Sequence, residues 1–143
     1  MSGLSSTTPI TPIAPVPGHE YAPGACNIGP WEIRRRRAIA GVAFAVAAVL
    51  LLALIATGAP VWTRLLVLFP LWGGAFSWLQ ARRRFCAGYA MSRQSNFGDG
   101  YGTLARVEDE AAHREDIKAV MRMTRDSFLV ALPLSIVAVL LPL

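Results

Sequence analysis

The hydrophobic positions of the chain are gathered into three long runs, and the charged positions all lie outside these runs. The first run, residues 38–57, carries no charge and as a helix would be about 30 Å long, the thickness of a bilayer hydrocarbon core. The second run, residues 65–81, contains Pro70, which predicts a kink. Only a short segment around Gly58-Ala-Pro60 separates the two runs, so the pattern predicts an antiparallel transmembrane helical hairpin over residues 30–92.

The third run, residues 127–143, is uncharged but short for a membrane crossing. It predicts a third transmembrane helix, with a re-entrant or surface segment as the alternative. Residues 93–126 begin as a loop and continue as a segment of dense mixed charge, with apolar residues at helical spacing. We expect a loop over 85–102 and a cytoplasmic amphipathic helix over Thr103–Arg125, which could run on into the third span with a bend at Pro133. The predicted fold class is all-α and integral to a membrane.

Residues 1–29 form a tail rich in proline, serine, threonine and glycine. Its closely spaced prolines favour extended polyproline II structure over helix. The tail also carries apolar residues that could dock on a partner: Ile10, Ile13 and Val16. The first helix is expected to begin near Pro30, because proline is favoured in a first helical turn, with Asn27 or Gly29 as its cap.

Composition and charge agree with a membrane protein. Hydrophobic residues make up 54% of the 143 residues and charged residues only 16%, against about 25% in typical soluble proteins. The net charge of +5 could indicate nucleic acid, but basic residues at the ends of apolar runs are typical of membrane orientation and of contact with anionic lipid. The positive-inside rule predicts a bacterial-type inner membrane protein with a cytoplasmic N-terminus and an outward C-terminus. The candidate headgroup and orientation residues are Arg34, Arg35, Arg36, Arg37, Arg82, Arg83 and Arg84.

The second apolar run also contains small residues at positions where helices could meet. Gly73, Gly74 and Ser77 would let another helix backbone approach closely, as small residues do inside membranes. These three residues are the candidate helix-packing positions.

Cys26 and Cys86 are the candidates for chemistry. They lie just before the first predicted span and just after the second, so the hairpin brings both to the same side of the membrane. The helix N-terminus and the surrounding arginines should favour the thiolate form of Cys26. A thiol pair is the functional interpretation, and two reduced cysteines used as packing residues are the alternative. Glu32, in the first turn of the helix, is expected to pair with Arg82–Arg84 and lock the hairpin ends together.

The sequence contains no complete catalytic, cofactor or metal motif. The glycine-rich segment Gly98-Asp-Gly-Tyr-Gly102 lacks the preceding strand and the lysine of a phosphate-binding loop and predicts a flexible turn. We therefore expect no enzymatic activity, no resident cofactor or metal and no small-molecule substrate.

Part of the chain resembles a known family. The segment Cys26-Asn-Ile-Gly-Pro-Trp-Glu-Ile-Arg34, the predicted hairpin and the closing Phe85-Cys86-Ala-Gly-Tyr89 resemble the YgaP-like transmembrane domain over residues 26–90. That family has an Asn-x-Gly opening, an arginine-rich first turn, two spans and a closing Cys-Pro-x-Tyr type of motif, in which Ala87 stands here in place of the proline. Its members often accompany or are fused to sulfurtransferase domains, so the resemblance implies a link between the two cysteines and sulfur chemistry.

Two functions fit these residues. The favoured one is a non-enzymatic accessory or structural subunit of a larger membrane complex, respiratory or photosynthetic for instance, supported by the proline-rich tail, the small-residue positions and the charged helix. The alternative is a thiol-active membrane protein that handles persulfide sulfur or senses redox state through Cys26 and Cys86.

Overall fold

The computed structural model describes residues 20–100 and 104–143. Its elements are α1 (Pro30–Ala56), the 3-10 helix η1 (Val61–Val67), α2 (Leu68–Arg83), α3 (Ala87–Met91), β1 (Gln94–Asn96), β2 (Leu104–Arg106) and α4 (Glu110–Leu140). The predicted polyproline II stretch, and Tyr101 and Gly102 of the predicted turn, lie outside the described residues.

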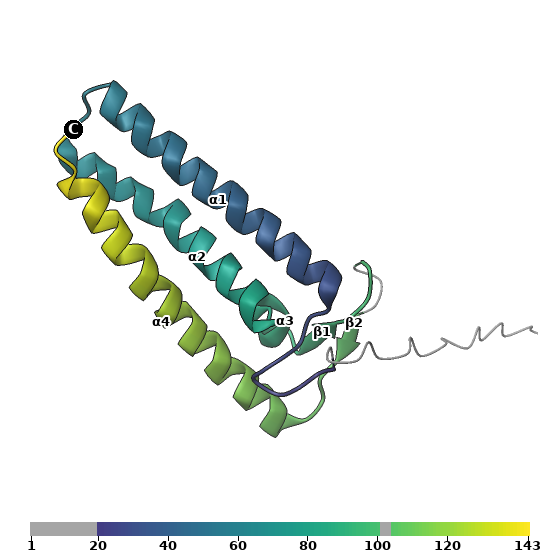
Figure 1. The fold of residues 1–143 in the computed structure, drawn as a ribbon. Coiled ribbons are helices and arrows are strands. Elements are labelled where there is room, and N and C mark those ends of the chain that lie inside the picture. Colours follow the sequence, from purple (N-terminus) through teal and green to yellow (C-terminus); the bar gives the residue numbers. More distant parts are fainter. Residues whose placement is uncertain (1–19, 101–103) are drawn as a thin grey trace, which may run out of the picture.

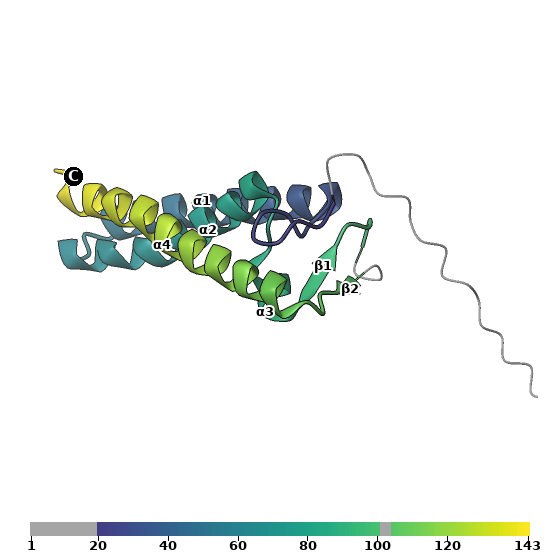
Figure 2. The same cartoon turned by 90° about the horizontal axis from the view of Figure 1, so that it is seen from below.

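The long helices form an antiparallel bundle in which α2 packs between α1 and α4 (Figure 1). The short helix α3 and the two strands lie together at one end of this bundle (Figure 2). We call it the basic end, because it carries Arg34–Arg37 and Arg82–Arg84. The opposite end, where residues 57–60 connect α1 to η1 and the C-terminus lies close by, is called the turn end.

Helix α1 follows from its sequence. It is rich in alanine and leucine, and Pro30 occupies its first turn, where a missing N–H loses no helix bond. Its 27 residues make a rod of about 40 Å. Its most apolar stretch has a mean hydropathy of 2.9 and is only 11% buried. Within the described residues, α1 and α4 are the two helices long and apolar enough to cross a membrane.

The second apolar run differs from the prediction. Val61–Val67 winds as a 3-10 helix and the α-helix begins only at Leu68, so Pro70 lies in a first helical turn and not at a kink. Proline has no N–H to give to the preceding turn, which therefore closes with the tighter i to i+3 bonds. At 16 residues, α2 is the shortest of the bundle helices in the described chain.

One helix, α4, covers both the charged segment and the third apolar run. It extends unbroken for 31 residues, through Pro133, so the predicted boundary between residues 126 and 127 is not a break in the structure. Its predicted start at Thr103 is wrong. Asp109 caps the helix by accepting a hydrogen bond from the Ala111 N–H (3.1 Å), and aspartate is a better N-cap than threonine.

The segment expected to be a loop contains regular structure. α3 follows α2 after a short corner, and Arg93, with φ of +56°, turns the chain from α3 into β1. β1 pairs antiparallel with β2, with Gln94 opposite Arg106 and Asn96 opposite Leu104. The all-α prediction is therefore right for the bundle but misses this small sheet, because strands of three residues are too short to show an alternating pattern.

The larger buried apolar side chains are concentrated at the basic end. One cluster contains Leu79, Phe85, Ala90, Ala119 and Met123, and a second contains Ile28, Ile33, Ala81 and Cys86. Along α1, by contrast, Val42, Val49 and Leu52 are each 65% exposed. The chain thus combines a well-packed cap at the basic end with helices whose outer faces are apolar.

Residues 20–29 belong to this cap, so the predicted tail over 1–29 is wrong for that part. The buried carboxylate of Asp116 on α4 accepts hydrogen bonds from the Tyr21 hydroxyl (2.9 Å) and the Gly24 N–H (2.7 Å). Burial, reinforced by the Asp116 carboxylate, raises the pKa of Tyr21 and keeps its hydroxyl a donor. Gly24 has φ of +69°, and a side chain there would lie 3.1 Å from the Glu115 carbonyl. These contacts fasten the segment to α4.

Candidate functional site

The cap contains a network of buried polar side chains centred on Asn27. Its amide oxygen accepts a hydrogen bond from the Cys86 N–H (2.6 Å), and its amide nitrogen donates to the Cys86 carbonyl (3.0 Å). Its backbone N–H donates to the Arg84 carbonyl, and its carbonyl accepts from the Asn96 N–H. Asn27 has 0% exposure, so these bonds replace water completely. They tie the segment before α1 to the α2–α3 corner and to β1.

Glu32 in the first turn of α1 is the second buried centre of this network. Its Oε1 accepts from the Tyr89 hydroxyl (2.9 Å), and its carboxylate oxygens lie 3.5 Å from Arg35 Nη1 and from Arg36 Nε. Burial raises the pKa of Tyr89, which keeps that hydroxyl protonated as a donor. The predicted pairing of Glu32 with Arg82–Arg84 is wrong, because residues three and four positions along the same helix already face it.

Cys86 lies inside the same network as a free thiol. Its side chain is buried, and Arg36 Nη2 donates a hydrogen bond to its Sγ (2.9 Å). A guanidinium thus stands between the Glu32 carboxylate and the sulfur. Arg36, Glu32 and Asn27 together hold the backbone and the side chain of Cys86 in one position.

Cys26 differs from its prediction. It is buried and free, and its Sγ lies 3.8 Å from the Ile28 carbonyl. Burial raises the pKa of the Cys26 thiol, and this outweighs the opposing effects of a backbone hydrogen bond from Ile28 and of the Arg84 charge. The expected thiolate-favouring field is therefore wrong, because the sequence could not show how far this position is removed from water. Its neighbour Asn27 bonds to Cys86, so both cysteines belong to one cap.

The arginines of the basic end separate into two groups. Arg35 and Arg36 turn toward Glu32, and Arg83 Nη2 bonds to Asp126 Oδ2 on α4 (2.6 Å). The remaining four line one cleft of about 370 Å³ together with apolar residues; its lining is Pro30, Ile33, Arg34, Arg37, Ala81, Arg82 and Arg84. The sequence treats the seven arginines alike, whereas the structure gives them different neighbours.

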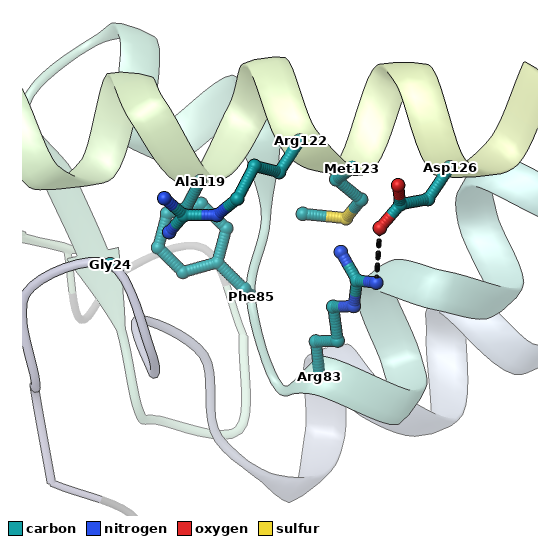
Figure 3. A pocket seen from close by; sticks show the side chains of 7 residues that line it. All are labelled: Gly24, Arg83, Phe85, Ala119, Arg122, Met123 and Asp126. Atoms are coloured by element: carbon teal, nitrogen blue, oxygen red, sulfur yellow. Dashed lines mark hydrogen bonds and ion pairs between the residues drawn. The ribbon is translucent and has the colours of Figure 1, made fainter.

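A smaller hollow of about 240 Å³ lies between the end of α2 and α4 (Figure 3). Phe85, Ala119 and Met123 form its apolar wall, and the Arg83–Asp126 ion pair closes one side. The guanidinium of Arg83 points toward α4 in this view, so its charge is matched by a carboxylate.

The candidate helix-packing residues have unequal surroundings. A Cβ added to Gly74 would lie 2.8 Å from two carbons of the Phe44 ring on α1, so this glycine makes room for the α1–α2 contact. Ser77 is buried in the bundle. Gly73 is exposed, and apart from its chain neighbours and the backbone of its own helix no described atom lies within 4 Å of the position that its Cβ would take.

Arg64 is a structural residue that sequence reasoning missed. It is 3% exposed at the turn end, and its guanidinium donates to the carbonyls of Ala138 (3.4 Å), Leu141 (2.9 Å) and Leu143 (2.6 Å). The Ala138 carbonyl lies in the last turn of α4, at the negative end of its dipole, and Leu141 and Leu143 directly follow the helix. The available signal was that Arg64 alone among the basic residues lies away from the basic flanks.

Comparison with protein-family models, with curated proteins and with solved structures gives no match to this chain. The resemblance to the YgaP-like transmembrane domain therefore stays a prediction. Within residues 20–100 and 104–143, no three His, Cys, Asp or Glu side chains are grouped to hold a metal ion. What the site offers is a rigid, internally bonded cap that presents an arginine-lined cleft beside an apolar bundle.

Proposed function

We propose that this chain is a small integral membrane protein that acts as a non-enzymatic accessory subunit of a larger membrane complex. One observation carries the proposal. The polar and reactive side chains at the basic end are buried and form hydrogen bonds within the cap; they are Asn27, Glu32 and Cys86. The outer faces of the helices, by contrast, are apolar and exposed. The polar groups are thus used within the fold, and the apolar helix faces are left to contact lipid or a partner protein.

The apolar faces support membrane insertion. Helix α1 is longer than the about 30 Å of a hydrocarbon core and is nearly unburied along its most apolar stretch. Seven arginines cluster at one end of the bundle, whereas the other end carries Arg64, which is buried and donates to the carbonyls of Leu141 and Leu143. By the positive-inside rule this arrangement favours the basic end as cytoplasmic. In this orientation the N-terminus is cytoplasmic and the C-terminus faces outward.

A shallow apolar groove on α1 supports contact with a partner helix. Its volume is about 480 Å³, and its lining is Val42, Ala45, Val46, Val49, Leu50 and Ala53. Small side chains such as Ala45 and Ala53 allow another helix to approach closely. In lipid the hydrophobic effect does not drive helix association, so close van der Waals packing of this kind takes its place.

Purification of the tagged full chain from its native membrane in mild detergent, followed by mass spectrometry, tests this function. We expect recovery with one large membrane complex at fixed stoichiometry. Ala45→Phe, which fills the α1 groove, should release the protein, whereas Val130→Phe on the exposed face of α4 should not. Migration of the wild type alone or as a homo-oligomer would overturn the accessory role.

A thiol-active protein is the second candidate, and it rests on the short contact between Arg36 and the Cys86 sulfur. It requires Cys86 to be reached by reagent in the folded protein, although the side chain is only 1% exposed. Cys26→Ser and Cys86→Ser variants should abolish the function of a thiol carrier and leave an accessory subunit in its complex. Retention of both variants in a complex whose activity is unchanged excludes the thiol role.

A further inference from the structure

Four of the basic-end arginines surround one open cleft between the start of α1 and the end of α2. Arg34 and Arg37 lie three residues apart on one face of α1, and Arg82 and Arg84 come from the opposite wall. All four side chains are exposed. Beneath them Ile33 and Ala81 are buried and form an apolar floor.

We propose that this cleft binds the phosphate headgroup of one anionic phospholipid. The proposal rests on the membrane location given under the proposed function and is independent of the accessory role. The cleft is lined by Arg34, Arg37, Arg82 and Arg84, whereas Arg35, Arg36 and Arg83 face carboxylates of the chain.

Charge is the first argument. Among the described residues, no carboxylate lines the cleft. The nearby acids Glu32 and Asp126 face Arg35, Arg36 and Arg83 instead. Guanidinium groups match phosphate oxygens in geometry as well as charge, and the positive end of the α1 dipole adds to the same field. The ligand group that best matches the charge and geometry of this cleft is a phosphate.

Position is the second argument, and it favours a lipid over a soluble phosphate. Arg37 directly precedes the uncharged residues 38–57, whose side chains are largely exposed along α1. A headgroup in the cleft would therefore have its acyl chains along that apolar surface. The guanidinium of Arg82 also lies over the Trp78 ring, 5.2 Å from its centroid, and an arginine with a tryptophan is typical of a membrane–water interface.

The test is native mass spectrometry of the purified full chain in neutral detergent, titrated with phosphatidylglycerol or phosphatidylcholine. The variant is Arg34→Gln with Arg37→Gln, chosen because Arg82 stacks on Trp78 and Arg84 is the left-handed C-cap residue that follows α2. The matched control is Arg106→Gln with Arg114→Gln, which removes the same charge from exposed positions outside the cleft. Phosphatidylglycerol should bind the wild type preferentially, and the cleft variant should bind it about 30-fold more weakly, or about fivefold for each arginine. The control should change by less than about twofold.

Equal weakening by both double variants would mean a general surface charge effect and would overturn the cleft. So would equal binding of phosphatidylglycerol and phosphatidylcholine by the wild type. Full competition by soluble glycerol phosphate at the lipid's own concentration would overturn the lipid assignment. Alkaline extraction of native membranes separates these results from failure of the membrane proposal. Release of the wild type by alkali refutes membrane insertion, whereas retention without lipid preference refutes the cleft alone.

Discussion

Asn27→Ala tests whether the cap is held together by its buried polar network. The substitution removes the amide that bridges the N–H and the carbonyl of Cys86 while keeping the backbone bonds of residue 27 available. It leaves the arginine cleft and the apolar faces chemically unchanged. The expected result is local opening of the cap without loss of the helices.

The structure sets the size of the effect. The Cys86 N–H would lose its Asn27 partner in a place without water, which costs about 1–3 kcal/mol. The Cys86 carbonyl keeps the Ala90 N–H at 3.0 Å, so its loss is that of an ordinary bond, about 0.5–1.5 kcal/mol. Together the free energy of opening the cap should fall by about 2–4 kcal/mol.

The assay is the rate at which a maleimide labels Cys86 in folded protein that carries Cys26→Ser. A buried thiol reacts only from the open state, so the rate follows the open population. The rate should rise by about 30- to 1,000-fold in Asn27→Ala, because each 1.4 kcal/mol is a factor of about ten. Gln94→Ala, at a half-buried position of β1 outside the Asn27 bridge, is the control and should stay within about threefold. If Asn27→Ala labels as slowly as the control, or if the wild type labels as fast as unfolded protein, the reasoning is refuted.

Three further predictions concern other parts of the chain. Arg64→Met should destabilise the fold by about 2–4 kcal/mol, because the carbonyls at and just after the end of α4 lose their donor. Hydrogen exchange should show faster exchange in the last turn of α4, with Arg64→Lys intermediate, and unchanged exchange there would contradict the capping role. Gly74→Ala should cost about 1–3 kcal/mol in detergent unfolding because of the Phe44 ring, with partial rescue by Phe44→Leu; Gly73→Ala is the matched control and should be neutral or slightly stabilising. In Cys86→Ser protein, alkylation of Cys26 should reach half its maximal rate at a higher pH than that of a free cysteine, because burial raises its pKa. Because the raised pKa favours the protonated thiol in the folded state, the contribution of Cys26 to the free energy of unfolding is present below the pKa of the unfolded thiol and is lost as pH rises through the folded pKa. An alkylation profile shifted to lower pH would contradict this reasoning.

The parts of the fold that sequence predicts are those set by local composition. The uncharged run from residue 38 to 57 has one favourable structure, a helix, and the short connection after it leaves only an antiparallel return. The α4 start was misplaced because residues 104–106 pair with β1 as a strand, and the helix begins only after the Asp109 cap. β1 and β2 were missed because strands of three residues show no alternating pattern, and because Asn96 of β1 bonds to Asn27, which lies far away in the sequence.

The candidate site was less predictable, because side-chain partners decide it. Composition showed that Cys26, Glu32 and the arginines share one end, but not that Glu32 turns to its own helix or that burial controls Cys26. In the sequence Arg64 is set apart from the other basic residues, but nothing there shows that its partners are carbonyls more than seventy positions later in the chain. Long-range pairing of this kind leaves no periodic pattern in the sequence.

The network and the cleft are two consequences of the same packing. Asn27 joins the residue before α1 to the corner after α2, and the cleft opens between the arginines of those same two helix ends. A phosphate headgroup that binds both walls of the cleft is therefore expected to favour the closed network, and any such coupling is reciprocal, so opening of the network is expected to weaken its binding. Packing thus gives seven similar arginines different neighbours: Glu32 faces Arg35 and Arg36, Asp126 faces Arg83, and the other four line the cleft.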